Sequence, residues 1–288
     1  MIVNERQKDL GNFMVGRLLP FRKKRQVGPF TFIDHMGPAT IGPHKYVDVD
    51  QHPHIGLSTL TYLFEGSIEH KDSTGANEII NPGDVGFMTS GKGVTHTERT
   101  PKHLRNGEVS TMHGYQIWVA LPKELESMEP RFDFIKSSDI PSWDEGSIRC
   151  KLIAGEGFSR ESPLQGYSPL FMVDIEATDK ATIDLRDKIN GEVAIVIVHG
   201  SITDDGETIE AGQMLISKTD QECSIDLGAG TRLLLFGGEP LPEERFLHWN
   251  FVSSSKDVLE KASLDWQQKK FPKVPGDDTY IPLPSMGR

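Results

Sequence analysis

Short strand-like segments run through the chain from its start to about residue 240, and they constrain its fold more than any other feature. They are rich in Val, Ile, Thr and aromatic residues, and Gly, Pro, Asn or Asp ends them at close intervals, as is typical of β-sandwiches and β-barrels. Examples are Gly28-Pro-Phe-Thr-Phe-Ile-Asp, Leu57-Ser-Thr-Leu-Thr-Tyr-Leu-Phe, Ala194-Ile-Val-Ile-Val and Arg232-Leu-Leu-Leu-Phe. We therefore expect an all-β fold.

A faint internal repeat divides this region into two halves. Leu63-Phe-Glu-Gly66-Ser-Ile followed by Ile80-Asn-Pro-Gly83-Asp-Val resembles Val196-Ile-Val-His-Gly200-Ser-Ile followed by Ile209-Glu-Ala-Gly212-Gln-Met. In each half a strand ends at a glycine, a hairpin follows, and a second glycine turn leads into another strand. The chain has 288 residues, about twice the usual ~150 per domain. We expect one barrel over residues 1–130 and a second barrel, with a C-terminal helix and tail, over residues 131–288.

The character of the sequence changes after residue 240. Ser254-Ser-Lys-Asp257 can cap a helix that runs to about Gln268, and its apolar stripe is expected to pack on a barrel. The stripe consists of Val258, Leu259, Ala262 and Trp266. Residues 122–144 are richer in Pro, Ser and charge and are predicted to form a linker, and residues 272–288 are predicted to be an extended surface tail.

Composition excludes several classes of protein. No apolar run approaches the ~20 residues that a spanning helix needs, and the N-terminus lacks the apolar core of a signal peptide. We therefore expect a cytoplasmic protein without a membrane partner. The net charge of -11 opposes direct binding to nucleic acid, because phosphate contacts need clustered Lys and Arg. The basic run Arg22-Lys-Lys-Arg25 is predicted to be a solvated loop, and the isolated Cys150 and Cys223 to be free thiols.

Two histidine motifs are the sharpest chemical signal. The first is His52-Pro-His54, and His96-Thr-Glu98 follows it with the same spacing. Residues two apart on a strand point to the same face, so each motif presents two potential ligands together. A single pair of this kind arises by chance and often lies on a solvated surface, but two pairs favour a metal site. Three neutral imidazoles and one carboxylate suit a divalent first-row metal and leave positions open for water, substrate or dioxygen.

The sequence resembles the pirin family of the cupin superfamily over roughly residues 10–270. The resemblance depends on a set of motifs in family order and spacing: His52-Pro-His54-x-Gly56, Thr61-Tyr-Leu-Phe-Glu-Gly66, His70-x-Asp72-Ser, Pro82-Gly-Asp-Val85, Met88-Thr-x-Gly91-x-Gly93, His96-x-Glu98, His113-Gly-Tyr-Gln-Ile-Trp-Val and Gly237-Gly-Glu-Pro-Leu-Pro-Glu. It implies two tandem cupin barrels, of the double-stranded β-helix type, with one metal in the N-terminal barrel. The ligands implied are His52, His54, His96 and Glu98.

The resemblance also implies two candidate functions. The first is a non-haem iron dioxygenase of the quercetin 2,3-dioxygenase type, acting with dioxygen on a flavonol or a similar enolisable aromatic. Its cofactor is expected to be Fe(II), with Mn, Co, Ni, Cu or Zn as alternatives, and Glu98 is the candidate catalytic base. The second is an iron-dependent, redox-responsive regulator that binds a protein partner without turnover. A sugar isomerase on the same barrel is a weaker alternative, because only Lys92 is close enough in sequence to bind phosphate.

Some positions depart from the family pattern. Many pirins have Arg, Gly, Phe and Glu where this chain has Ile55, Gly56, Leu57 and Ser58, and Gln-Trp-Met where it has Gly86-Phe-Met. Because hydrogen bonds around the ligands tune a metal, these changes leave metal binding a safer expectation than any named activity. Two further histidines, His70 and His113, are candidates for the mouth of the site, but single histidines are more often core or surface residues.

The second half is expected to hold no metal. The repeat carries the four ligand positions to the neighbourhood of Arg186, Lys188, Ile225 and Leu227, none of which is a ligand of the expected kind. His199 stands alone at the end of a predicted strand, and we interpret it as a structural residue. The C-terminal half is therefore predicted to support the structure and to close the site.

Overall fold

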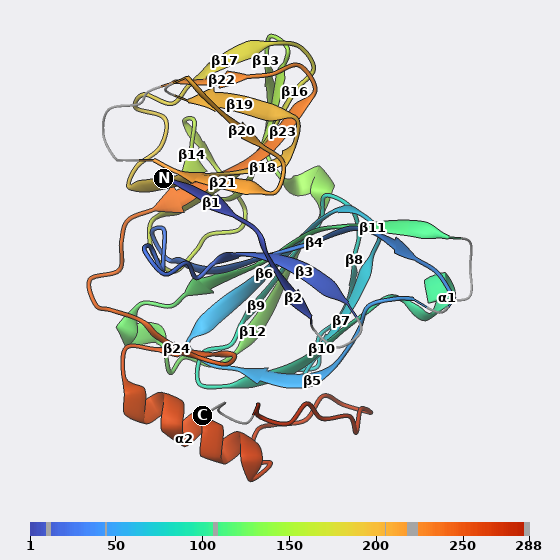
Figure 1. The fold of residues 1–288 in the computed structure, drawn as a ribbon. Helices are drawn as coiled ribbons and strands as arrows, with labels where there is room; N and C mark the ends of the chain where they lie inside the picture. Colours follow the sequence, from blue (N-terminus) through green and yellow to red (C-terminus); the bar gives the residue numbers. More distant parts are fainter. Residues whose placement is uncertain (10–12, 44, 106–108, 205, 218–223, 285–288) are drawn as a thin grey trace. The chain divides into compact units, whose positions relative to one another are not determined.

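The computed structural model describes residues 1–9, 13–43, 45–105, 109–204, 206–217 and 224–284 (Figure 1). Within these residues β-strands predominate, and the α-helices are the short α1 (Lys102–Arg105) and the longer α2 (Lys256–Gln267). The all-β prediction and the predicted C-terminal helix are confirmed. No helix among the described residues is long and apolar enough to cross a membrane.

The chain forms two compact units, each made of separate stretches of sequence. Unit 1 contains Met1–Gln7, Gly16–Asp34 and Ile135–Leu241, and unit 2 contains Lys8–Val15, His35–Phe134 and Pro242–Arg288. Both histidine motifs and α2 therefore belong to unit 2. Residues before 35 alternate between the two units, and residues after 241 return to unit 2. A single boundary at residue 130 does not describe this division.

Two sheets make up most of unit 2. One has the strand order β5-β10-β7-β8, and the other has the order β12-β9-β6-β11-β4-β3-β2. The bounds are β2 (Arg6–Asp9), β3 (Met14–Leu19), β4 (Phe30–Ile41), β5 (Asp48–His54), β6 (Leu57–Glu65), β7 (Ile68–Asp72), β8 (Asn77–Ile80), β9 (Val85–Thr89), β10 (Val94–Arg99), β11 (Ser110–Ala120) and β12 (Arg131–Ile135). One cluster of buried side chains draws on both sheets, including Leu63 of β6, Ile68 of β7 and Ile80 of β8.

Unit 1 repeats this arrangement. Its sheets have the orders β17-β22-β19-β20 and β1-β21-β18-β23-β16-β14-β13, and β15 pairs with β14. The bounds are β1 (Ile2–Asn4), β13 (Ser142–Glu145), β14 (Ile148–Gly157), β15 (Arg160–Glu161), β16 (Leu170–Ala177), β17 (Ala181–Asp184), β18 (Glu192–His199), β19 (Ser201–Asp204), β20 (Glu207–Glu210), β21 (Gln213–Ile216), β22 (Ser224–Leu227) and β23 (Thr231–Gly238). Its aliphatic core contains the buried Cys150; Cys223 lies outside the described residues.

The two strand orders correspond position by position, so the internal repeat is a duplication of topology. The path β9-β6-β11 in unit 2 matches β21-β18-β23 in unit 1, and β5-β10-β7-β8 matches β17-β22-β19-β20. The glycines of the repeat end equivalent strands. Gly66 has φ +81° and Gly200 has φ +74°, and a Cβ there would lie 2.8 Å from the Thr111 carbonyl oxygen and 2.6 Å from Thr231 Oγ1 respectively. Glycine is therefore required at both turns.

Helix α2 lies in unit 2 with the hairpin β24 (Phe246–His248) and β25 (Phe251–Ser253). Leu259, Ala262 and Trp266 are buried together with Ile55 and Phe251. Val258 is 44% exposed, so its predicted place in the buried stripe is wrong. At 100° per residue it lies about 40° from Ala262, outside the arc that the other three define.

Two segments predicted to be irregular have more structure than expected. The predicted linker, residues 122–144, includes β12, which extends a sheet of unit 2, and most of β13, which pairs with β14 in unit 1. The tail has no helix or strand among residues 272–284, as expected, but Val274 is buried at 2% exposure. The tail is therefore packed into unit 2 and does not simply lie on its surface.

Candidate metal centre

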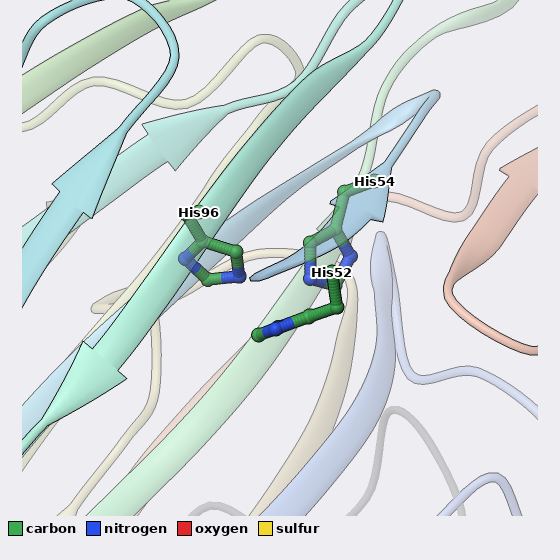
Figure 2. Close-up of side chains that lie close together, drawn as sticks. All are labelled: His52, His54 and His96. Atoms are coloured by element: carbon green, nitrogen blue, oxygen red, sulfur yellow. The ribbon is translucent and has the colours of Figure 1, made fainter. Parts of the chain in front are cut away.

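Three histidines converge between the paired strands β5 and β10. His96 lies directly opposite His52, and Val94 lies opposite His54. The imidazole centroids are 4.3 Å apart for His52 and His96, 4.9 Å for His54 and His96, and 5.2 Å for His52 and His54. One ring nitrogen of each residue lies within 4.8 Å of the other two, and Figure 2 shows the rings gathered together. The predicted same-face pairing of His52 and His54 therefore holds in the structure.

His52 and His96 each have one ring nitrogen held by the protein. His52 Nδ1 lies 2.8 Å from the Asp50 carbonyl oxygen, and His96 Nδ1 lies 3.4 Å from His70 Nδ1. His54 interacts with the backbone of Asn250. His54 Nδ1 and His96 Nε2 are buried and have no hydrogen-bond partner in the described part of the chain. Because a metal-bound histidine typically has its second nitrogen anchored by the protein, this arrangement fits a metal.

Burial keeps the three imidazoles neutral. It lowers the pKa of His52 to about 4 and those of His54 and His96 well below the ordinary 6.5, and repulsion between neighbouring histidines adds to the effect. The neutral form is the one whose lone pair can bind a metal. The site is therefore in its ligand state at neutral pH without a proton having to leave.

His70 belongs to the same centre through a relay. Its Nε2 lies 3.1 Å from Asp72 Oδ2, and its ring stacks on Phe132 with centroids 4.3 Å apart. Asp72 Oδ1 in turn accepts bonds from Thr74, and these contacts lower the Asp72 pKa although burial opposes them. The ionised Asp72 accepts a hydrogen bond from His70 Nε2–H, so His70 Nδ1 is an acceptor and His96 Nδ1 the donor. That tautomer leaves His96 Nε2 with its lone pair.

Glu98 lies beside this cluster without joining the group of three. A β-bulge separates its register from that of His96. Burial raises the Glu98 pKa from its ordinary 4.5 to about 7, although a hydrogen bond with Gln116 opposes the shift. The Gln116 oxygen accepts a bond of 2.7 Å from Thr61 Oγ1, which leaves the amide N–H groups for the carboxylate. Its role as fourth ligand or base stays a prediction.

Sequence reasoning missed several residues around the centre. Trp118 stands edge-on to His54 with centroids 5.1 Å apart, and Gln116 and Phe132 contact Glu98 and His70. Gln116 and Trp118 are two apart on β11, so a period-2 reading of the motif that begins at His113 could have identified them. Nothing in the local sequence marks Phe132.

His113 lies elsewhere in unit 2. Its Nε2 is 2.9 Å from His35 Nε2, and its ring contacts Phe64. It is not part of the cluster of three, which agrees with the expectation that a single histidine is more often a core or surface residue than part of a site. His70, by contrast, is joined to the cluster by hydrogen bonding, which its lone position in the sequence did not reveal.

The residues that depart from the family pattern have ordinary structural partners. Ile55 packs in the apolar cluster of α2, and Ser58 Oγ lies 3.0 Å from Thr89 Oγ1. A Cβ at Gly86 would lie 2.3 Å from Ile80 Cδ1, so a larger residue there would require this neighbour to move. Ile55 follows His54 and so points to the opposite face of the strand.

Among the residues that the structure describes, the equivalent strands of unit 1 carry no comparable group. Gly66 and Gly200 end equivalent strands, so the β7–β10 and β19–β22 registers make Ile225 the counterpart of Glu98. The positions predicted for His96 and Glu98 therefore shift by two residues, and that of His96 moves to Cys223, outside the described residues. Arg186 and Lys188, which were predicted for His52 and His54, follow the end of β17. A cavity of about 430 Å³ borders Leu185 and Ile225, and its described lining contains no histidine.

The duplicated sheets and the histidine cluster define a two-domain cupin with a candidate metal centre in one unit. The Pirin family model matches residues 12–119, and the model for the Pirin C-terminal cupin domain matches residues 172–272. The chain belongs to the pirin family.

Individual relatives agree with this assignment. A pirin-like protein of Caulobacter vibrioides is 44% identical over 289 residues, covering 99% of both chains. A Pseudomonas aeruginosa protein provisionally named quercetin 2,3-dioxygenase is 35% identical over 259 residues, covering 90% of this chain and 80% of the relative. The crystal structure of quercetin 2,3-dioxygenase from Acinetobacter baumannii superposes with a TM-score of 0.91 at 31% identity, covering 100% of this chain and 95% of that one.

Proposed function

We propose that this pirin is a metal-dependent dioxygenase of the quercetin 2,3-dioxygenase type, with Fe(II) as its metal. The observation that carries the proposal is the buried set of three neutral imidazoles, two of which have ring nitrogens without a partner in the described part of the chain. A buried polar atom that lacks a partner costs about 1–3 kcal/mol. A divalent metal would satisfy those atoms, and the names of the relatives supply the substrate class.

The donor set favours a first-row transition metal. Imidazole nitrogen suits Fe, Ni, Cu and Zn, whereas Mg and Ca prefer sites made of oxygen. With Glu98 as a fourth ligand the set carries one negative charge. When bound, such a metal supplies Lewis acidity toward an ionisable hydroxyl and redox access to dioxygen.

Glu98 is the residue that we propose to move a proton. With a pKa of about 7 its carboxylate can accept a proton from the 3-hydroxyl of a flavonol at neutral pH, because a general base works best near the operating pH. The Gln116 amide holds the carboxylate and Thr61 holds the amide, so the accepting Oε atom is kept in place.

Aromatic side chains next to the cluster suit a flat substrate. Trp118 lies beside His54, and Phe132 covers the ring of His70. Offset and edge-to-face aromatic contacts are each worth about 0.5–1.5 kcal/mol beyond burial. An enolisable aromatic would therefore find both a chelating centre and ring contacts.

One assay tests the proposal directly. The metal-free protein is loaded with Fe(II) without oxygen, the metal content is measured, and quercetin is then added under air. We expect oxygen uptake, carbon monoxide release and loss of the flavonol absorbance. Fully metallated protein that takes up no oxygen would contradict the dioxygenase proposal and leave a metal-dependent, protein-binding regulator as the better function. Loading with Mn, Co, Ni, Cu or Zn in parallel identifies the metal that supports turnover.

A matched variant tests the site itself. His96→Ala removes an imidazole from the cluster, and we expect neither stoichiometric metal nor oxygen uptake. His113→Ala is the control, because that residue lies outside the cluster and should leave both intact. Full metal content in the His96→Ala variant would refute the assignment of the site.

A further inference from the structure

The residues that flank the ligand His52 on its strand are held by the far C-terminus of the chain. Gln51 is buried at 3% exposure, and alternation along β5 directs its side chain to the face opposite His52. Its partners come from residues 274–281, which we call the C-terminal segment. These residues and the strand both belong to unit 2.

Gln51 is bonded to the C-terminal segment by every polar group that it has. Its Nε2 donates to the Asp277 carbonyl at 2.9 Å and to the Thr279 carbonyl at 3.0 Å, and its Oε1 accepts from Val274 N at 2.8 Å. Its backbone N–H donates to Thr279 Oγ1 at 3.1 Å, and its backbone oxygen accepts from Ile281 N at 2.9 Å. The segment thus continues the hydrogen bonding of the ligand strand.

Arg99 provides a second link, next to Glu98. Its guanidinium pairs with Asp48 and Asp50 of β5 at 2.9 Å each, and it also bonds Asp277 of the C-terminal segment. Asp50 is the residue whose carbonyl oxygen anchors His52 Nδ1. The path Asp277–Arg99–Asp50–His52 therefore connects the C-terminal segment to the orientation of a candidate ligand.

The C-terminal segment has its own anchorage on α2. The Tyr280 ring stacks on Trp266 with centroids 4.6 Å apart, and its hydroxyl donates to the Trp266 carbonyl oxygen at 3.2 Å. Trp266 Nε1 donates to the Ile281 carbonyl oxygen at 2.9 Å. Because helix and segment hold each other, the segment presents Asp277 and Thr279 to β5 in a fixed position.

We propose that Arg99 and Gln51 are positioning residues, through which the C-terminal segment fixes His52 for metal binding. The inference rests on the proposed metal site and extends it to residues that touch no ligand atom. Hydrogen-bond partners that orient a metal ligand typically increase metal affinity by about 10–100-fold. Arginine suits this role because its planar fork can bridge several carboxylates, which the point charge of lysine does not do.

The test is a metal titration of the full chain. Metal-free wild type, Asp277→Ala and Arg99→Lys are titrated without oxygen, with Co(II) followed by its visible absorption and Fe(II) by competition with a chromophoric chelator. We expect both variants to bind about 10–100-fold more weakly and to give an altered Co(II) spectrum. The double variant should bind no more weakly than Arg99→Lys alone, because both changes break one path.

Asp278→Ala is the matched control. Asp278 is the next residue along the chain, 97% exposed, and it pairs only weakly with Lys273 at 3.4 Å. It should bind as wild type does. Thermal unfolding of each metal-free variant separates positioning from stability, since a purely structural role lowers the unfolding temperature and leaves affinity and spectrum unchanged. Variants that keep the affinity to within about twofold of wild type and the same spectrum, even if they unfold at a lower temperature, would overturn this inference and leave the proposed metal site standing. A wild type that binds neither metal overturns the proposed site and this inference together.

Discussion

Unit 2 and unit 1 place different chemistry on the same pair of strands. In unit 2 the β5–β10 pair carries His52 opposite His96, and in unit 1 the β17–β22 pair carries Ile183 opposite Ile225. The order of the neighbouring strands is the same in both. The duplicated fold therefore provides positions that face a shared interior, and the side chains at those positions decide between a metal centre and an aliphatic core.

The difference has an energetic side. Burying an aliphatic side chain stabilises a fold by about 1.5–3 kcal/mol, and unit 1 takes this gain at Ile183 and Ile225. Unit 2 buries imidazoles instead. Burial lowers the pKa of His96, and ring nitrogens of His54 and His96 have no hydrogen-bond partner among the described residues. A protein keeps such groups where they have a use, which is why the histidine cluster indicates function and its aliphatic counterpart indicates stability.

Loss of one imidazole should have the largest effect. His96→Ala is expected to weaken metal binding by more than about 100-fold, since loss of a ligand exceeds the 10–100-fold effect of losing an outer partner. Metal content by plasma emission spectroscopy after dialysis measures it. Ile225→Ala, on the equivalent strand of unit 1, should leave the metal content unchanged. A loss of metal in that variant would show that the two units are not independent in this respect.

The free energy of unfolding should depend more on the aliphatic core of unit 1 than on the histidine cluster of unit 2. Ile225→Ala removes aliphatic atoms from a well-packed core and is expected to lower the free energy of unfolding by about 2–5 kcal/mol, as measured by chemical denaturation of the metal-free protein. His96→Ala on the matched strand of unit 2 should lower this free energy much less, because it removes a buried polar ring. An equal cost at both positions would contradict the division between site and core.

The hydrogen-bond relay from Asp72 through His70 can be tested in the same way, with a control on the corresponding strand of unit 1. Asp72→Asn weakens the acceptor for His70 and is expected to lower metal affinity about 10-fold, the smaller end of the range for outer partners. Asp204→Asn is the control, because Asp204 lies on β19, the strand of unit 1 that corresponds to β7. Isothermal titration should therefore show Asp204→Asn binding as tightly as wild type. Unchanged affinity in Asp72→Asn would remove the relay from the site.

Acid should destabilise the metal-free protein through unit 2. In the folded protein the pKa values of His52, His54 and His96 lie below the ordinary 6.5. Below pH 6.5 these residues are therefore protonated in the unfolded chain but stay neutral in the folded one. The stability that they contribute is complete above pH 6.5 and falls as the pH decreases toward about 4. The unfolding temperature of His52→Phe should fall less steeply over this window. Parallel pH profiles for the two proteins would refute this origin.

The smallest effect concerns Glu98. A carboxyl with a raised pKa is deprotonated only above about pH 7, so proton competition should weaken metal binding below that pH, by at most about tenfold per pH unit. Between pH 6 and 8 the clustered His52, His54 and His96 stay neutral because their pKa values are lowered, so we assign the slope to Glu98. Titrations of Glu98→Gln should be flat over the same range. A slope that persists in the variant would assign the proton elsewhere.

Much of the architecture could be predicted because its determinants are local. Glycines in the left-handed region end equivalent strands at Gly66 and Gly200, and period-2 spacing places His52 and His54 on one face. The counterparts of His96 and Glu98 in unit 1 shift by two residues because registers depend on pairing across the sheet, which short-range sequence similarity does not reveal. Phe132 and the contacts of His70 arise between strands that are distant in sequence, and no local pattern reveals them.

The C-terminal segment illustrates the same limit from the other direction. Its Pro, Gly and Asp content correctly indicated that it lacks regular structure. Its packing depends on Gln51 and Trp266, which lie on other elements of unit 2. Composition predicts whether a segment can be a strand or a helix, but it does not reveal whether another surface of the protein offers it a matching set of donors and acceptors.

The bonds between Gln51 and the C-terminal segment have a consequence for synthesis on the ribosome. Gln51 and Val274 are separated by 223 positions, so the strand that carries His52 is made long before the residues that complete its hydrogen bonding. Nascent chains without the C-terminal segment expose the Gln51 amide and leave Arg99 without Asp277. On the role that we propose for this segment, the binding centre is completed only after residues 274–281 have been made, although its histidines lie in the first third of the chain.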